Sequence, residues 1–261
     1  MQELESYMRE LRLHGMRASL HERLRYALDQ KISFVDFLQL LLEDELVARN
    51  GTGYQRRLKQ SRLQPHKRLD TYEFSHQPQL DTRLVSELAT MRFVSSNHNI
   101  ILMGKPGVGK THLANALGLK AIEQGHKVLF IHANELIDEL QRSRATDSYQ
   151  RVLKKLIGYD LLIIDELGFK AFTARGTDDF FEIIRRRYEI RSTIITTNRD
   201  FQGWDTILGD TVIASAVIDR LVHHSHVIKI LGDSYRLKTF TKGSPENDSN
   251  LVETLEENPL D

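Results

Sequence analysis

Eight consecutive residues have the types and spacing of a phosphate-binding loop. They are Gly104, Lys105, Pro106, Gly107, Val108, Gly109, Lys110 and Thr111, and they fit the pattern G-x-x-x-x-G-K-[ST] between an apolar strand and a helix. Glycines let main-chain N–H groups converge on an anion, and the helix adds the positive end of its dipole. We predict that Lys110 reaches the β and γ phosphates of ATP and that the Thr111 hydroxyl ligates Mg²⁺. His112, the next residue, is assigned to the same nucleotide site.

An acidic pair, Asp165 and Glu166, directly follows the apolar run at 161–164. Because parallel strands end at the same side of a sheet, we expect this pair beside the phosphate loop. Asp165 would then hold Mg²⁺, and Glu166 would polarise the attacking water as a general base. Asn198 ends a further apolar run, "TIITTN". We predict that its amide holds the attacking water or contacts the γ-phosphate; an ordinary turn residue is the alternative.

Two arginines flank the last apolar run, Arg220 before it and Arg236 after it. Arginine stabilises the charge that spreads over a γ-phosphate during cleavage, from the same chain or from a neighbouring subunit. Three histidines, at 223, 224 and 226, are close together in the sequence and raise the question of a metal site. The sequence shows no matching set of further ligands, so we do not predict a zinc site there.

The composition indicates a protein of the cell interior. The chain has 261 residues, of which 40% are hydrophobic and 28% charged, as is typical of soluble globular proteins. It contains no cysteine, which excludes disulfides and thiolate metal sites. The first residues are charged throughout, unlike a signal peptide, and no apolar run approaches the roughly 20 residues that cross a bilayer. We therefore expect a cytoplasmic protein with no membrane partner.

The formal net charge of zero hides two oppositely charged segments. Residues 244–261 carry six acidic residues and no basic one, with little apolar content, and are predicted to be disordered. Residues 54–70 are strongly basic with a single acid, which indicates a polyanion partner, although a solvated helix face is the plain alternative. The predicted DNA-binding residues are Arg56, Arg57, Lys59, Arg62, Lys67 and Arg68.

The hydrophobic pattern predicts two architectures along the chain. Helical spacing predicts helices over residues 1–50 with a break at Gly15, and "NGTG" at 50–53 predicts a turn. From about residue 97, apolar runs alternate with helical segments, as in a parallel sheet covered on both faces. The predicted strands are 99–103, 127–132, 161–165, 192–198 and 226–230. The predicted fold class is α/β, a parallel sheet flanked by helices, plus a small all-helical N-terminal domain.

These motifs, in this order, resemble the AAA+ P-loop ATPases of the DnaA/DnaC branch, and most closely the IstB family of helper ATPases in insertion-sequence transposition. The resemblance covers roughly residues 5 to 241. It is carried by "GKPGVGKTHLANALG", "DLLIIDELGF", "RLVHHSHVIKILGDSYRLK" and the N-terminal segments "LRLHGMRASL" and "FLQLLLEDE". Together with the turn signals and the charge pattern, it predicts a helical partner- or oligomer-binding domain at 1–70 and an AAA+ ATPase domain at 71–243, while the acidic tail at 244–261 lies outside the resemblance.

The resemblance also implies a function. Members of the family assemble on duplex DNA as ATP-dependent oligomers, deform the duplex, and deliver it to a partner transposase that they stimulate. By motif position, Arg220 would be the arginine finger that reaches into a neighbour's site, and Arg236 the sensor arginine acting in its own chain. Hydrolysis would then depend on assembly of the homo-oligomer.

Three other functions share parts of this pattern. A replicative helicase loader of the DnaC type has the same ATPase core but acts on single-stranded DNA with a helicase. A small-molecule kinase is disfavoured by the Asp165–Glu166 pair, since kinases must exclude water from the reaction. A pure nucleotide-binding module would bind ATP without hydrolysing it. Oligomer number, DNA target preference and the identity of the transposase do not follow from the sequence.

Overall fold

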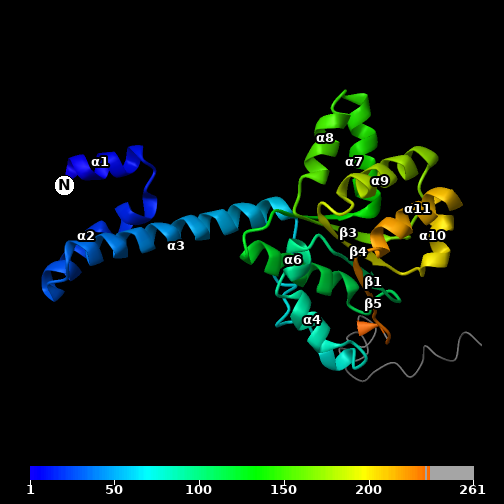
Figure 1. Cartoon of the computed structure of the whole chain (residues 1–261), viewed down its shortest axis with the longest axis horizontal. Coiled ribbons are helices and arrows are strands. Elements are labelled where there is room, and N and C mark those ends of the chain that lie inside the picture. The colour runs from blue at the N-terminus through cyan, green and yellow to red at the C-terminus, as the bar shows by residue number, and fades with distance from the viewer. Residues whose placement is uncertain (233, 236–261) are drawn as a thin grey trace, which may run out of the picture.

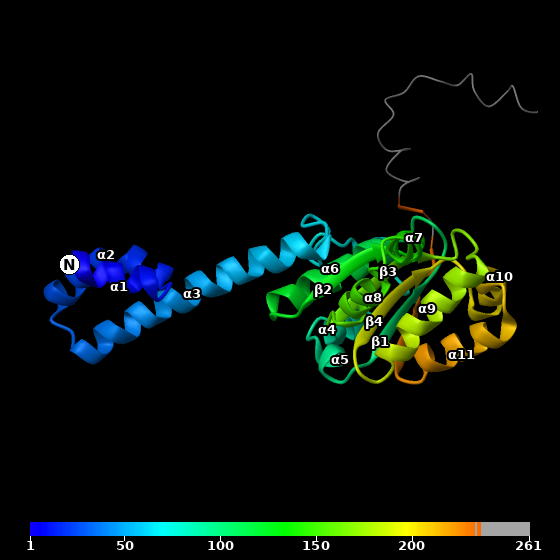
Figure 2. The ribbon, with the colours of Figure 1, turned by 90° about the horizontal axis from the view of Figure 1, so that it is seen from above.

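The computed structural model describes residues 1–232 and 234–235 of the chain. Figures 1 and 2 show two parts, a helical arm and an α/β body, joined by the long helix α3 (Phe34–Ser61). In the arm, α2 (His14–Gln30) packs along the N-terminal half of α3, and α1 (Gln2–Glu10) packs on α2. The C-terminal half of α3 reaches the body, where it contacts α6 and β2.

The body is built on one five-stranded parallel sheet with the order β2-β3-β4-β1-β5. The strands are β1 (Asn99–Met103), β2 (Val128–His132), β3 (Leu161–Leu167), β4 (Ser192–Thr197) and β5 (Ser225–Lys229). Because side chains alternate along a strand, each strand supplies both faces. In β1, Ile100 packs on one face and Ile101 on the other, and both are fully buried.

Two helical layers cover the sheet and explain why its strands are almost entirely apolar. One face is covered by α4 (Thr82–Leu88), α5 (Arg92–Ser95) and α6 (Lys110–Glu123), with residues from the segment after α3. The other face is covered by α7 (Ala133–Ala145), α8 (Tyr149–Ile157), α9 (Ala174–Arg187), α10 (Trp204–Leu208) and α11 (Thr211–Val222). The predicted fold class is confirmed, and the predicted strands agree with the observed ones to within a residue or two.

The helical arm has its own small core of Met8, Met16, Leu20 and Leu41. The prediction that Gly15 breaks a helix is wrong, since the break is at residues 11–13 and Gly15 lies in the first turn of α2. A Cβ at Gly15 would come within 2.6 Å of the Glu45 Cα, so glycine permits the close approach of α2 to α3. The buried Glu45 carboxylate accepts the main-chain N–H groups of Gly15 and Met16, which stabilises the N-terminus of α2.

The turn predicted at residues 50–53 is also wrong, because α3 continues through Asn50–Gly53 and ends only at Arg62, whose φ is +60°. Two glycines inside a helix cost about 1 kcal/mol each. Tertiary packing offsets this cost, since Tyr54 and Leu58 on the next turns pack against the body's core. The Thr52 hydroxyl also donates to the Ala48 carbonyl oxygen within the helix.

No helix in the described part of the chain is long and apolar enough to cross a membrane. The tail at 244–261 and the C-terminal end of the proposed ATPase domain lie outside the described residues.

Candidate nucleotide site

The phosphate loop joins β1 to α6 in a conformation that requires glycine. Gly107 and Gly109 have φ values of +82° and +100°, which residues with a Cβ rarely adopt. A Cβ at Gly107 would also lie 2.1 Å from the Ser234 Oγ, and one at Gly109 would lie 2.9 Å from the Tyr72 hydroxyl. The loop therefore packs closely against two other segments while its main chain stays accessible.

Lys110 and Thr111 open α6 at the end of this loop. The Lys110 Nζ donates to the main-chain oxygens of Gly104 and Lys105, at 2.7 and 2.8 Å, so that its charge lies within the loop. The Thr111 Oγ1 donates to the two carboxylate oxygens of Asp165, at 3.0 and 3.1 Å. The predicted proximity of the phosphate loop to the end of β3 is thus present in the structure.

The end of β3 is irregular at the acidic pair. The register between β3 and β4 shifts between Ile164 and Leu167, which is a β-bulge, and Glu166 in the bulge has a φ of +60°. A bulge re-aims side chains, and here Asp165 is fully buried while the Glu166 side chain is half exposed. The Thr196 hydroxyl joins the two, because it donates to the Asp165 Oδ1 at 2.5 Å and accepts the Glu166 main-chain N–H at 2.9 Å.

His132 ends β2 next to the same carboxylates. Its Nδ1 lies 3.6 Å from the Asp165 Oδ2 and 3.4 Å from the Glu166 Oε2. The sequence analysis did not identify His132 or Thr196. Both stand at the carboxyl ends of strands, so the rule that located Asp165 also applied to them.

A cavity of about 260 Å³ opens between the phosphate loop and residues 67–77, with Tyr235 on its wall. Tyr72 and Gln77 line it, are 7% and 3% exposed, and were not identified from the sequence. Neither the Tyr72 hydroxyl nor either amide atom of Gln77 has a hydrogen-bond partner among the described residues. Burial raises the pKa of Tyr72 to about 12. Buried polar groups without partners are rare and call for a physical explanation.

His112 also lines this cavity. Its Nε2 hydrogen-bonds the main-chain oxygen of Arg68 at 2.8 Å, and its ring packs edge-on against that of Tyr72. Asn198 lies on the other side of the loop, exposed at the end of β4, in a second cavity that also contains Gly104 and Lys105. The structure thus places both predicted residues next to the phosphate loop.

Arg220 is far from the phosphate loop of its own chain. It lies on α11 and shares a small cavity with Asn99 and Thr193, which stand at the start of β1 and β4. The five residues of β1 separate that end of the sheet from the loop and span about 13 Å. The Arg220 guanidinium donates to the Ala216 carbonyl oxygen and lies over the ring of Phe181. Arg236 lies outside the described residues.

The basic segment does not form a single patch. Arg62 forms ion pairs with Glu135 and Glu139 of α7, and Arg68 lies near Asp70 and Glu123. The other four residues differ: Arg57 donates to the Ile122 carbonyl oxygen, Lys67 lines the 260 Å³ cavity, and Arg56 and Lys59 are exposed on α3. Of the predicted DNA-binding residues, Arg57 and Arg62 therefore attach the C-terminal end of α3 to the body.

The parallel sheet in this strand order, the phosphate loop after β1 and the acidic pair after β3 define a P-loop nucleotide-binding protein of the AAA+ class. Solved structures of this class have the same fold. The chain is similar to the DnaC helicase loader, with 26% identity and a TM-score of 0.52 over 64% of this chain and 98% of that one. It is also similar in fold to a replication initiator DnaA bound to AMPPCP and single-stranded DNA, with a TM-score of 0.55, 22% identity, and coverage of 70% of this chain and 55% of that one.

The model of the IstB-like ATP binding protein family matches residues 6–243, and the chain belongs to this family. It is 38% identical to the insertion sequence IS21 putative ATP-binding protein of Pseudomonas aeruginosa, over 97% of this chain and 98% of that protein. It is 37% identical to the insertion sequence IS5376 putative ATP-binding protein of Geobacillus stearothermophilus, over 90% of this chain and 94% of that protein. The protein is therefore an ATP-binding protein of the insertion-sequence type.

Proposed function

We propose that the protein hydrolyses ATP, assembles on duplex DNA as a homo-oligomer, and recruits and stimulates the transposase of an insertion sequence. The observation that carries the ATPase part is the hydrogen bond from the Thr111 hydroxyl to the buried Asp165 carboxylate. It brings the phosphate loop and the acidic strand end into one site.

In this proposal each group near the loop has a distinct task. Main-chain N–H groups of residues 104–111 surround the phosphates, and Lys110 exchanges its carbonyl acceptors for phosphate oxygens. Glu166, half exposed on its bulge, accepts a proton from the attacking water. Asn198 orients that water from the neighbouring strand. Thr196 holds the bulge in place and is a positioning residue.

Magnesium fits this site. The Thr111 hydroxyl oxygen lies 3.0 and 3.1 Å from the two carboxylate oxygens of Asp165. Mg²⁺ prefers such hard oxygen ligands. When bound, Mg²⁺ would neutralise charge on the β and γ phosphates.

The 260 Å³ cavity is the proposed site of the nucleobase. The Gln77 amide has no partner among the described residues and offers one acceptor oxygen and an amino group with two donor hydrogens. An adenine edge presents the complementary amino donor and ring-nitrogen acceptor, whereas guanine presents an oxygen where adenine has its amino group. We therefore propose that Gln77 selects ATP over GTP.

The position of Arg220 supports a role in trans. It lies at the end of the sheet opposite its own phosphate loop, so it can reach a γ-phosphate only in a neighbouring subunit. A single subunit would then be a poor ATPase, and assembly on DNA would switch hydrolysis on.

DNA and transposase would contact the long helix α3. Arg56 and Lys59 remain exposed on α3 for phosphate contacts, which would make binding insensitive to sequence and strongly sensitive to salt. On the same helix Phe34, Leu38 and Leu42 follow one another at four-residue spacing and are 93%, 51% and 49% exposed. Large exposed apolar side chains gathered on one helix mark a protein contact, and we assign them to the transposase or a neighbouring subunit.

A helicase loader is the second candidate, favoured by the fold shared with DnaC. The two differ in the DNA that stimulates hydrolysis. Duplex DNA should stimulate a transposition helper more than single-stranded DNA, and the reverse should hold for a loader.

The nucleotide proposal is tested by titrating ATP into Lys110→Ala and Lys120→Ala variants. Lys120 lies on the same helix and pairs with Glu123 on the surface, so it is the matched control. We expect Lys110→Ala to weaken ATP binding about 100-fold, as expected for losing a charge-assisted contact of about 3 kcal/mol, and Lys120→Ala to have no effect. Equal affinities in the two variants would contradict the proposal.

Light scattering with duplex DNA, with and without ATP and across salt concentrations, tests assembly.

A further inference from the structure

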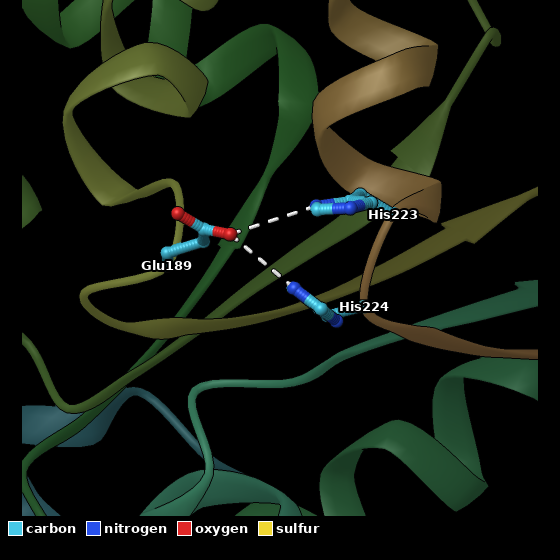
Figure 3. Close-up of side chains that lie close together, drawn as sticks. All are labelled: Glu189, His223 and His224. Atoms are coloured by element: carbon cyan, nitrogen blue, oxygen red, sulfur yellow. Dashed lines mark ion pairs between the residues drawn. The ribbon is translucent and has the colours of Figure 1, made fainter.

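Three side chains at the opposite end of the sheet from the phosphate loop converge on one point. Figure 3 shows Glu189, from the loop after α9, facing His223 and His224, which directly follow α11. The Glu189 Oε1 lies 3.6 Å from the His223 Nδ1 and 3.3 Å from the His224 Nε2. One ligand atom from each of the three residues lies within 4.8 Å of the others.

We propose that Glu189, His223 and His224 bind a first-row transition-metal ion of the zinc type. Zinc binds histidine nitrogen and carboxylate oxygen at about 2.0–2.2 Å in tetrahedral geometry, which places the ligand atoms roughly 3.4 Å from one another. The two printed separations of 3.3 and 3.6 Å bracket this value. Two imidazoles and one carboxylate suit zinc and its neighbours rather than Mg²⁺. Three protein ligands leave the fourth position for water.

The surrounding structure holds these ligands in place. Glu189 has a φ of +56°, and its main-chain oxygen accepts a hydrogen bond from the Asn97 side chain at 3.1 Å. The main-chain oxygen of His224 accepts the N–H of Asn99 at the start of β1. The ring of His98 stacks on that of His224 with centroids 5.5 Å apart. The site therefore joins the α9–β4 loop to the end of α11 at the end of the sheet where β1 begins.

An ion pair between Glu189 and protonated histidines would explain the same distances, so binding itself must be measured. The Tyr188 hydroxyl hydrogen-bonds the His223 Nδ1 at 2.7 Å, and an ion at that nitrogen would replace this bond. All three ligand side chains are about half exposed, so an ion can enter directly from solvent. This inference does not depend on the proposed ATPase function.

The test is a titration of the full-length protein with Zn²⁺ by calorimetry, and with Co²⁺ by its tetrahedral absorption band. Nucleotide is left out, because ATP itself chelates Zn²⁺, and excess Mg²⁺ is present to compete for the carboxylates of Asp165 and Glu166, which lie near His132. We expect one ion per chain. Replacing an outer-shell partner of a metal ligand typically costs 10–100-fold in affinity, so we expect losses of at least about 100-fold in Glu189→Gln and in His224→Ala.

The control variants are His21→Ala and His132→Ala. His21 forms an exposed ion pair with Glu5 at 2.9 Å, and His132 belongs to the other group of candidate ligands. Both should bind Zn²⁺ as the unsubstituted protein does, and Zn²⁺ should raise the melting temperature of all but the Glu189 and His224 variants. The assignment would be overturned if the protein did not bind Zn²⁺, or if Glu189→Gln and His224→Ala each bound Zn²⁺ with unchanged affinity. It would also be overturned if His132→Ala lost Zn²⁺ binding.

Discussion

Replacing Thr196 by valine should uncouple nucleotide binding from hydrolysis. Thr196 is fully buried on β4, and its hydroxyl joins the Asp165 carboxylate to the main chain of Glu166. Valine has nearly the same shape but can form neither hydrogen bond. The substitution therefore removes the support of the β-bulge without opening a cavity.

The expected size follows from the two bonds that are lost. The bond to the Asp165 carboxylate is worth about 1.5–3 kcal/mol and the part-buried bond to the Glu166 N–H about 0.5–1.5 kcal/mol, so the variant should lose about 2–4.5 kcal/mol of unfolding free energy. Asp165 keeps its hydrogen bonds from Thr111, so ATP affinity should change by less than about threefold. Glu166 would lose its fixed position, and a misplacement of about 1 Å can cost 100-fold in rate. We expect kcat to fall between about 10- and 100-fold.

The assay compares Thr196→Val with Thr193→Val by phosphate release, ATP titration and chemical denaturation. Thr193 lies on the same strand, is 1% exposed, and accepts a hydrogen bond from Arg187 at 3.1 Å. It should lose comparable stability but keep its kcat. Equal kcat values for the two variants would refute the idea that Thr196 positions Glu166.

Three further predictions address other parts of the molecule. Gln77→Leu should bring ATP and GTP affinities to within about threefold of each other, measured by competition binding; retained preference for ATP would contradict the role of the amide. Arg220→Ala should bind ATP but not hydrolyse it. Mixing it with Lys110→Ala should restore ATP hydrolysis, because the Arg220→Ala subunit supplies an intact phosphate loop and the Lys110→Ala subunit supplies the arginine. An Arg220→Ala variant that hydrolyses ATP alone would contradict an arginine finger in trans. A hydrogen bond from Arg23 lowers the pKa of Asp44 to about 2. A carboxylate whose pKa is lowered on folding stabilises the fold at pH values above its unfolded pKa of 3.8, and this stability is lost as the pH falls toward the folded pKa. Hydrogen-exchange protection of α2 should therefore be constant above pH 4 and fall between pH 4 and pH 2, more steeply than in Arg23→Gln. Identical pH profiles in the two proteins would contradict the role of the Arg23–Asp44 bond.

The sequence predicted those features that follow from local rules. A glycine-rich loop of this pattern between an apolar strand and a helix is typical of phosphate binding. Parallel strands end at the same side of a sheet, so Thr111 and Asp165 could be expected to lie close together. The strands were recognisable because both of their faces are buried.

Other features depend on tertiary contacts that no local pattern encodes. Glu189 reaches His223 and His224 from a different element, so the histidines alone did not indicate a ligand set. The cavity with Gln77 forms because the chain after α3 folds back over the phosphate loop. The sequence of the basic segment predicted one DNA-binding patch, but in the structure Arg62 forms ion pairs with two glutamates of α7.

The central claim is that one site binds ATP through the phosphate loop and hydrolyses it through Glu166. The most direct test is phosphate release by Glu166→Gln on duplex DNA, at ATP concentrations that saturate the variant. The account predicts that Glu166→Gln binds ATP and assembles on DNA like the unsubstituted protein while its turnover falls at least about 100-fold. Unchanged turnover, or an unsubstituted protein that binds ATP on DNA without releasing phosphate, would contradict it.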